Sequence, residues 1–282
     1  MNTKTIGKRI RDILFGVLSF FLALFLFLDA VCALASMTVL NEESWMEQMT
    51  VSGYYSEKEQ EITKKLVQLG NASGLPSDFF EDVIDPVQIQ KDMQNYMDSY
   101  FDGTSRILDT TPFQQKFRAA LDRFIEEKNA KVDGKSVDNL VKQAKQIYSG
   151  NLEIPLFIKL SSYLQMVRNY LPYIIGGLSL LSGVIILVLL LANKWRHRAF
   201  KYYYYACAGT GLCLLALSVY LTASGGLKKI VLESKALYQM VVSFGSSVTV
   251  YLWVLTAVFA VLALSMFFLY RTFYLKAAGS TD

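Results

Sequence analysis

Residues 171–192 read LPYIIGGLSLLSGVIILVLLLA, and none of these side chains is charged. About 20 such residues cross the hydrocarbon core of a bilayer as a helix, since each residue adds about 1.5 Å. Residues 202–223 and 247–270 carry no charge either, and residues 13–35 carry only Asp29. All four stretches are apolar on every side, whereas a surface helix of a soluble protein needs only an apolar stripe. The sequence therefore predicts an all-α membrane protein with four transmembrane helices.

The composition of the whole chain supports this class. Of its 282 residues, 53% are hydrophobic and 18% are charged, whereas about 25% are charged in a typical soluble domain. The chain therefore fits neither a disordered protein nor a soluble single-domain enzyme. No segment repeats at a fixed period, which argues against a repeat array.

The first apolar stretch also resembles a secretory signal, because basic residues precede it and Ala33 and Ala35 form an A-x-A cleavage pattern. Apolar residues continue beyond Asp29 as far as Leu40, however, which is longer than the apolar core of a usual signal. We therefore expect residues 13–35 to remain as an uncleaved membrane anchor, with a cleaved signal as the alternative.

Basic residues are distributed unevenly among the hydrophilic segments. Residues 1–12 and 193–201 contain four Lys and Arg each, and residues 271–282 contain two. Since Lys and Arg gather on the cytoplasmic side of membrane proteins, we expect both termini and residues 193–201 to be cytoplasmic. Residues 224–246 and the long segment 41–170 then lie on the outer side of the plasma membrane.

The segment 41–170 carries repeated signals for helix starts, each followed by apolar residues at helical spacing. The starts are Ser56 with Glu59 as a capping box, Asp85 with Pro86, Thr111 with Pro112, Ser136, and Pro155. The alternation of a strand is not sustained anywhere in this segment. We therefore expect a compact all-α extracytoplasmic domain of about 110–130 residues, which is large enough to bury its own core.

Residues 227–244 combine apolar and basic side chains after a Gly-Gly pair. Helical spacing would place the apolar side chains on one face. We expect a short amphipathic helix on the outer surface of the membrane. The alternatives are a lid packed under the extracytoplasmic domain and a pore helix.

Asp29 is the one acid within the four apolar stretches. Intramembrane carboxylates often belong to proton or ion pathways. The other stretches contain no Lys, Arg or His to pair with this carboxylate, however, and Asp29 lies toward the outer end of its stretch. We expect an interfacial acid that reaches water, with a role in transport as the alternative.

Small residues recur at helical spacing in two predicted membrane helices. They are Gly176, Ser179 and Gly183 in the second helix, and Cys207 and Gly211 in the third. Small side chains let helix backbones approach closely in a membrane. Because the connection between these helices is short, we expect the two small faces to pack against each other, with homodimerisation through the second helix as the alternative.

Side chains for catalysis or metal binding are scarce. The chain has one histidine, His197, on the predicted cytoplasmic face, so no Ser-His-Asp or Cys-His arrangement is available elsewhere, and no His or Cys spacing matches a metal site. The cysteines, Cys32, Cys207 and Cys213, all lie in the apolar stretches, so the outer domain has no disulfide, as is common in bacteria. We expect no catalytic residue, metal or cofactor, and no nucleic-acid partner.

The segment 41–170 contains three further motifs. They are Tyr54-Tyr55 before a helix, Gly74-Leu75-Pro76 leading into Phe80-Glu81-Asp82-Val83, and Tyr96 and Tyr100 before Gly103. These motifs and the predicted topology resemble a group of Firmicutes four-helix integral membrane proteins with an all-helical extracellular domain and no established function. The order of elements is also loosely similar to permease subunits of the FtsX and MacB kind, although only residues 193–201 are present here to engage an ATPase.

These features favour a non-enzymatic plasma-membrane protein that presents an extracellular helical domain as a sensor, scaffold or accessory subunit. Its expected partners are the lipid bilayer and a protein bound through the domain. The alternative is a transporter, a channel or a subunit of one, which would use Asp29 and the small-residue faces. A membrane enzyme has the least support, because no nucleophile–base pair is visible.

Overall fold

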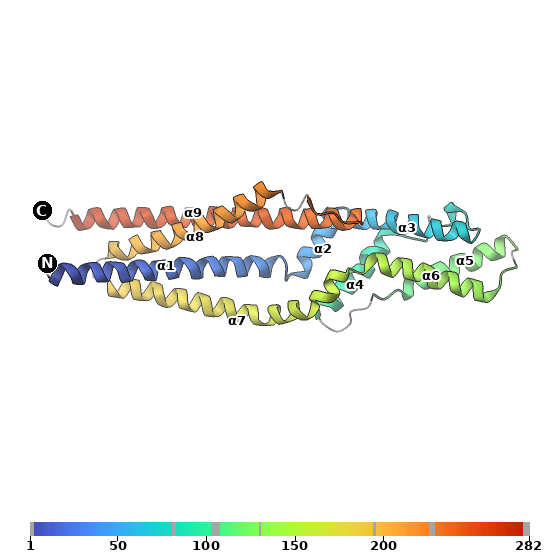
Figure 1. Ribbon diagram of the computed structural model, residues 1–282, viewed down its shortest axis with the longest axis horizontal. Helices are drawn as coiled ribbons and strands as arrows, with labels where there is room; N and C mark the ends of the chain where they lie inside the picture. The colour runs from blue at the N-terminus through green and yellow to red at the C-terminus, as the bar shows by residue number, and fades with distance from the viewer. Residues whose placement is uncertain are drawn as a thin grey trace. The chain divides into compact units, whose positions relative to one another are not determined.

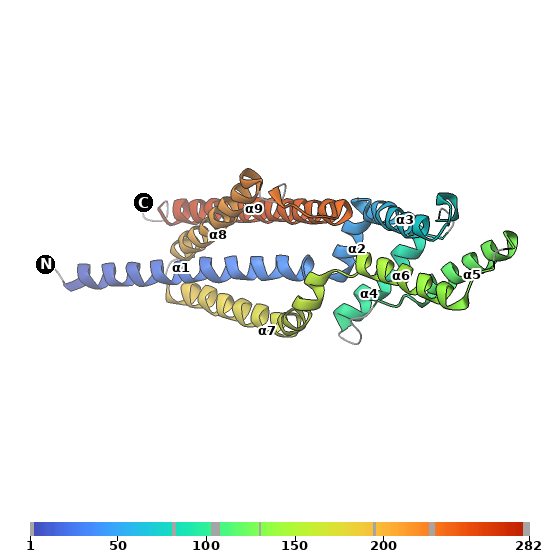
Figure 2. The ribbon, with the colours of Figure 1, turned by 45° about the vertical axis from the view of Figure 1, so that its right-hand side comes forward.

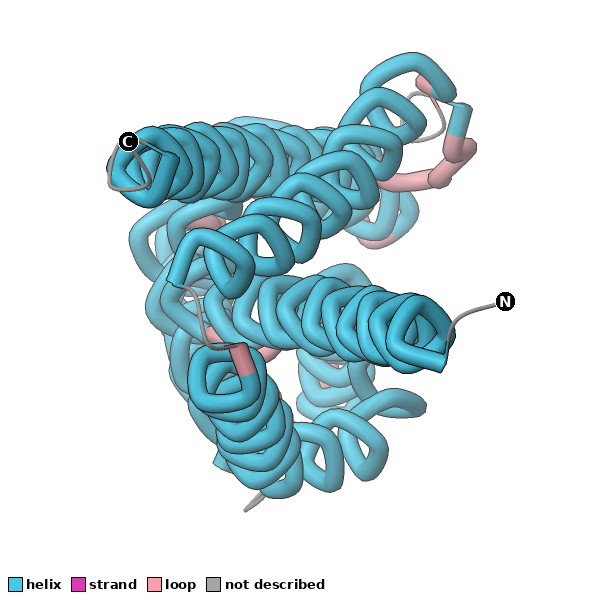
Figure 3. The backbone as a smooth tube through the Cα atoms, turned by 90° about the vertical axis from the view of Figure 1, so that its left-hand side faces the viewer, coloured by secondary structure: helices cyan, strands magenta, loops and turns pink. Residues whose placement is uncertain are grey.

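The computed structural model describes residues 3–80, 83–102, 108–129, 131–193, 196–225 and 229–278. The chain forms two compact units: unit 1 contains Met1–Leu40, Arg168–Lys229 and Gly245–Asp282, and unit 2 contains Asn41–Val167 and Ile230–Phe244. Within the described ranges every regular element is a helix and no strand is present (Figure 3). The predicted all-α class is therefore confirmed.

Four helices are long and apolar enough to cross a membrane (Figure 1). They are α1 (Thr3–Met37), α7 (Pro155–Ala192), α8 (Arg196–Ser224) and α9 (Lys235–Ala278). The candidate spans within them are Ile10–Met37, Tyr163–Ala192, His197–Ser224 and Lys235–Lys276. Each apolar stretch identified in the sequence falls inside one of these spans, so the prediction of four such helices is confirmed.

Within unit 1, α1 makes its most extensive contact with α8. Ser19 Oγ donates to Tyr202 O at 2.7 Å, and Thr210 Oγ1 donates to Ala23 O at 3.0 Å. Gly209 lies beside Ala23, and a Cβ added at Gly209 would be 3.4 Å from the Ala23 Cβ. Small and hydroxyl side chains thus bring the two helices together, as is common between helices in lipid.

Large apolar side chains cover the exposed surface of unit 1. Examples from three helices are Phe20, Leu180, Val261 and Phe268. In water each Å² of such surface costs about 25 cal/mol, whereas lipid tails remove this cost. The surface of unit 1 is therefore the one expected of a protein solvated by lipid.

Unit 2 is built of helices (Figure 2), and its buried apolar side chains form one continuous core. Its helices are α2 (Glu42–Val51), α3 (Tyr54–Ala72), the 3₁₀ helix η1 (Ser77–Phe80), α4 (Pro86–Asp102), α5 (Thr111–Glu127), α6 (Gly134–Leu152), and the first residues of α7 and α9. α3 packs against both α4 and α6, and α5 packs against α6. α3 also contacts α2 and η1, so it joins the other helices of this unit.

The helix starts of unit 2 follow the sequence signals only in part. Asp85 caps α4 as predicted, since its Oδ1 accepts a backbone N–H of the first turn at 2.9 Å. Ser56 does not cap α3: the helix begins at Tyr54, after Gly53 with a φ of 70°, and Ser56 Oγ donates to Gly53 O at 3.0 Å. The earlier start places Tyr54 and Tyr55 in the core. Burial of two rings outweighs a cap worth about 1 kcal/mol.

Residues 235–244 differ from the expected short helix on the membrane surface. They are the first residues of the long helix α9, and Ala236 and Met240 are buried in the core of unit 2. The expectation of a separate interfacial helix is therefore wrong for these residues, because protein rather than lipid head groups covers their apolar face. Of the other residues of that prediction, 229–234 precede α9, and 227 and 228 lie outside the described ranges.

Gly70, near the end of α3, lies directly against the ring of Phe80. A Cβ added at Gly70 would collide with that ring and would lie 3.3 Å from the Leu75 Cβ. The Phe80 ring is buried and packs edge-to-face on Phe79 at a centroid distance of 4.9 Å. The ring therefore has no free space to move into, and close packing requires a glycine at this position.

We expect Gly70→Ala to destabilise unit 2 by about 1–3 kcal/mol, the usual cost of overpacking a core. Urea unfolding of the full chain in nanodiscs, followed by circular dichroism, should show a lower midpoint. Gly150→Ala in α6 is the matched control, because nothing lies within 4 Å of its added Cβ and its midpoint should stay or rise. Equal midpoints for Gly70→Ala and the unmodified chain would contradict the packing.

Candidate functional site

Lys58 is a lysine in the core of unit 2, with a relative exposure of 1%. Its Nζ lies 2.9 Å from Glu61 Oε2, one turn along α3, and 2.9 Å from Ser234 Oγ. Ser234 Oγ in turn donates to Glu61 Oε2 at 2.8 Å. We refer to Lys58, Glu61 and Ser234 as the Glu61 cluster.

The charges of the Glu61 cluster depend on each other. Burial lowers the pKa of Lys58, although Glu61 offsets part of this effect. Burial alone would raise the pKa of Glu61, but hydrogen bonds from Lys58, the Ala236 amide and Ser234 outweigh it and hold this pKa below its ordinary value. The stabilisation by Glu61 is therefore complete at neutral pH and is lost as the pH falls through that lowered value. Removing Glu61 would therefore leave the Lys58 charge buried without a counterion.

The Glu61 cluster also caps the start of α9. The first backbone N–H groups of a helix have no partner within the helix. Here Ala236 N–H donates to Glu61 Oε1 at 3.2 Å, and Leu237 N–H donates to Ser234 Oγ at 3.2 Å. A carboxylate at this end also interacts favourably with the helix dipole. The cap of α9 thus comes partly from α3, far away in the sequence.

The start segment of α9, residues 234–244, is held in unit 2 along its whole length. Near its beginning, Lys235 Nζ lies 2.7 Å from Glu57 Oε1. Near its end, Ser243 Oγ donates to Gln48 Oε1 at 2.8 Å. The Phe244 ring stacks on Trp45 of α2, with centroids 4.1 Å apart and planes inclined by 17°. These contacts join α2 and α3 to one face of α9.

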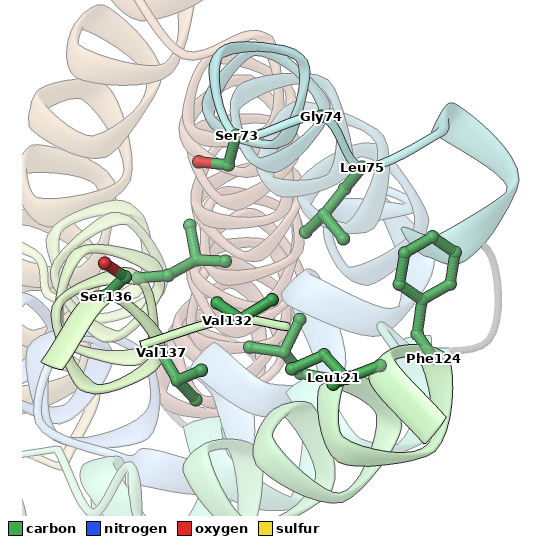
Figure 4. Close-up of a pocket in the computed structure, with 10 residues that line it drawn as sticks. Ser73, Gly74, Leu75, Leu121, Phe124, Val132, Ser136 and Val137 are labelled. Carbon is green, nitrogen blue, oxygen red and sulfur yellow. The ribbon is translucent and has the colours of Figure 1, made fainter. Parts of the chain in front are cut away.

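A separate apolar pocket of about 370 Å³ lies in unit 2 where the end of α3, the end of α5 and the start of α6 meet (Figure 4). Its lining residues are Ser73, Gly74, Leu75, Leu121, Phe124, Ile125, Val132, Ser136, Val137 and Leu140. Figure 4 shows Leu75, Val132 and Leu121 directed into the same space. The lining contains no charged side chain, so the pocket suits an uncharged apolar group.

Two of the predicted site residues contact each other in unit 1. Ser179 Oγ of α7 donates to Asp29 Oδ2 of α1 at 3.1 Å. The other carboxylate oxygen, Oδ1, is buried and has no hydrogen-bond partner among the described residues. Asp29 and Ser179 thus form a polar contact between two candidate spans, and one such contact does not by itself form a pathway across a membrane.

The predicted packing of the two small-residue faces differs from the structure. A Cβ added at Gly176 or Gly183 would meet nothing within 4 Å, and Ser179, between them in the sequence, contacts Asp29 of α1 rather than α8. Gly211 instead lies beside Phe259 of α9, and Cys207 is half-buried. The physical reason is that α8 packs mainly against α1, through the contacts of Ala23, rather than along this face of α7.

In the part of the chain that the structure describes, no group of three or more His, Cys, Asp or Glu side chains could hold a metal ion. Comparison with protein-family models, with curated proteins and with solved structures gives no match for this chain.

We expect Glu61→Ala to destabilise unit 2 by about 3–5 kcal/mol, because it leaves the Lys58 charge buried without a counterion. Lys58→Met combined with Glu61→Gln removes both charges, keeps an acceptor for the α9 cap and should recover most of this loss. Arg118→Ala is the control, since the Arg118–Asp138 pair is exposed and should contribute only about 0–1 kcal/mol. Urea midpoints of the full chain in nanodiscs measure all three; a double variant as unstable as Glu61→Ala would refute the charge argument.

Proposed function

We propose that this chain is a non-enzymatic integral protein of the plasma membrane that presents unit 2 outside the cell as a sensor domain. Four helices of sufficient length and hydropathy support the membrane assignment. The excess of Lys and Arg in residues 1–12, 193–201 and 271–282 supports cytoplasmic termini. With that orientation the segment 41–170, between the first and second spans, is extracytoplasmic.

The observation that carries the sensor role is the attachment of α9. Its first turns bury Ala236 and Met240 in the core of unit 2 and are capped there by Ser234 and Glu61, and the same helix continues to Ala278 through the fourth candidate span. A ligand or partner that changes the packing around α3 therefore changes the capping of a membrane helix. A scaffold would need no such connection, so the geometry favours a sensor over a passive display domain.

The transporter alternative has one supporting observation, the orphaned Oδ1 of Asp29. The remaining three apolar stretches contain no charged residue that could continue a pathway. The sensor role draws instead on several independent contacts of the Glu61 cluster and of Trp45 with Phe244. We therefore place the sensor role first.

The sensor role predicts that weakening the Glu61 cluster changes the membrane helices. In a chain without native cysteines, spin labels at Leu14→Cys in α1 and Leu275→Cys in α9, both exposed, report a distance within unit 1. We expect Ser234→Ala, and more strongly Glu61→Ala, to shift or broaden this distance distribution, by about the 1–2 Å of typical helix shifts.

Asp138→Asn is the matched control for the distance measurement, because it alters an exposed unit 2 charge whose partner, Arg118, belongs to α5 and not to α9. Its distribution should equal that of the parent chain. If both cluster variants also give the parent distribution while circular dichroism shows an intact helical fold, the sensor role is wrong.

The proposed orientation predicts which positions a membrane-impermeant maleimide reaches on intact cells. Val87→Cys, exposed on α4 of unit 2, should be labelled at once in the cysteine-free chain. Leu275→Cys, exposed near the C-terminus, should be labelled only after the cells are permeabilised. If Leu275→Cys is labelled on intact cells and Val87→Cys is not, the orientation is opposite to the proposed one, and unit 2 is not an extracellular sensor.

A further inference from the structure

The apolar pocket of unit 2 lies between the end of α3, the end of α5 and the start of α6. α3 ends before Gly74, which has a φ of 78°, and α5 ends before Asn129, which has a φ of 49°. These left-handed residues turn the chain on two sides of the pocket and separate the helix ends. The space between them has a volume of about 370 Å³.

The walls of this pocket are aliphatic and aromatic, and they are accessible from outside the protein. Val132, between α5 and α6, is 48% exposed although it is apolar. Figure 4 shows its side chain directed toward Leu121 and Leu75 across the pocket. Apolar surface left in water is unfavourable, by about 25 cal/mol for each Å². Binding of an apolar molecule would remove this cost.

The polar groups of the lining restrict the chemistry of a ligand. Only Ser73 and Ser136 contribute polar side chains. Ser73 Oγ already donates to Leu69 O at 3.3 Å, so toward a ligand it can act as an acceptor, and Ser136 carries a hydroxyl that can donate or accept. A charged ligand would lose its hydration here without gaining a counterion.

The volume limits the size of the ligand. A cavity of about 150 Å³ holds benzene, so a volume of about 370 Å³ holds roughly 15 heavy atoms. This volume also lies at the lower end of the range of small-molecule sites, about 300–1,000 Å³.

We propose that this pocket binds an uncharged, largely apolar small molecule of about 15 heavy atoms that carries one carbonyl or hydroxyl group. The carbonyl or hydroxyl contacts Ser73 or Ser136, and the hydrocarbon body contacts the apolar walls. As the ligand class of the proposed sensor, this inference rests on the sensor role. It is tested at the pocket itself, however, so a failed distance measurement on unit 1 and a failed binding measurement are distinguishable.

Benzophenone is a suitable probe, because it is uncharged, has one carbonyl and about 14 heavy atoms, and forms covalent bonds with nearby C–H groups under ultraviolet light. We expect photolabelling of the full chain in nanodiscs, read by peptide mass spectrometry, to modify residues 121–140. Benzophenone dissolved in the lipid should also label the membrane helices. The extent of that labelling is the internal reference for the labelling of residues 121–140. The anionic analogue 4-benzoylbenzoate should label residues 121–140 about tenfold less, relative to its label on exposed residues of unit 2.

Val132→Trp fills the pocket from its edge and should reduce benzophenone labelling of residues 121–140 about tenfold. Val87→Trp, at an exposed position of α4 outside the pocket, is the control and should leave the labelling unchanged. The inference is overturned if residues 121–140 are labelled no more than other exposed parts of unit 2. It is equally overturned if the charged analogue labels them as well as benzophenone, or if Val132→Trp and Val87→Trp give the same result.

Discussion

The structure of unit 2 depends on hydrogen-bond acceptors for the backbone N–H groups at the start of α9. A helix that begins inside a protein core must find acceptors for these groups. α9 finds them in Glu61 and in its own Ser234, and the same carboxylate neutralises Lys58. Ser234 Oγ uses its full capacity, since it donates to Glu61 and accepts from Lys58 and Leu237 N–H. The buried Lys58 charge, the Glu61 carboxylate and the unpaired N–H groups of α9 would each be unfavourable alone, and here they satisfy one another.

This arrangement explains why a buried lysine can be retained. A buried ion pair is a poor source of stability, because desolvation of both charges opposes their attraction. In unit 2 the Lys58–Glu61 pair has a second role, since it orients the carboxylate toward the Ala236 amide. Replacement by apolar residues could fill the same volume, but it would leave the first turn of α9 without this acceptor. The pair therefore contributes specificity for one packing partner, the first turn of α9.

The sequence was sufficient to predict the features that depend on local patterns. Uninterrupted apolar stretches identify the four candidate spans, and Asp85 followed by Pro86 identifies the start of α4. It was insufficient for the partner of residues 235–244, because an amphipathic face looks the same whether lipid or protein covers it. It was also misleading for Gly176 and Gly183, since small residues permit a close contact without requiring one.

Part of the Glu61 cluster could have been predicted from the spacing of residues in α3. Tyr54, Lys58, Ile62 and Leu66 recur every four residues and are all buried on one face of α3. A lysine inside such an apolar column needs a buried acid, and Glu61 is one turn away. The third member, Ser234, is 173 residues from Glu61, so only the folded chain reveals it. The apolar pocket is likewise formed by the ends of separate elements, whose meeting point no local pattern encodes.

Hydrogen exchange of the full chain in nanodiscs tests most directly whether the start of α9 belongs to unit 2. We expect the amides of residues 237–244 to exchange as slowly as those of the buried face of α3, including Ile62 and Leu66, because both open in the same cooperative unit. Rapid exchange of residues 237–244, at the rate of a frayed helix end, together with slow exchange in α3 would contradict it.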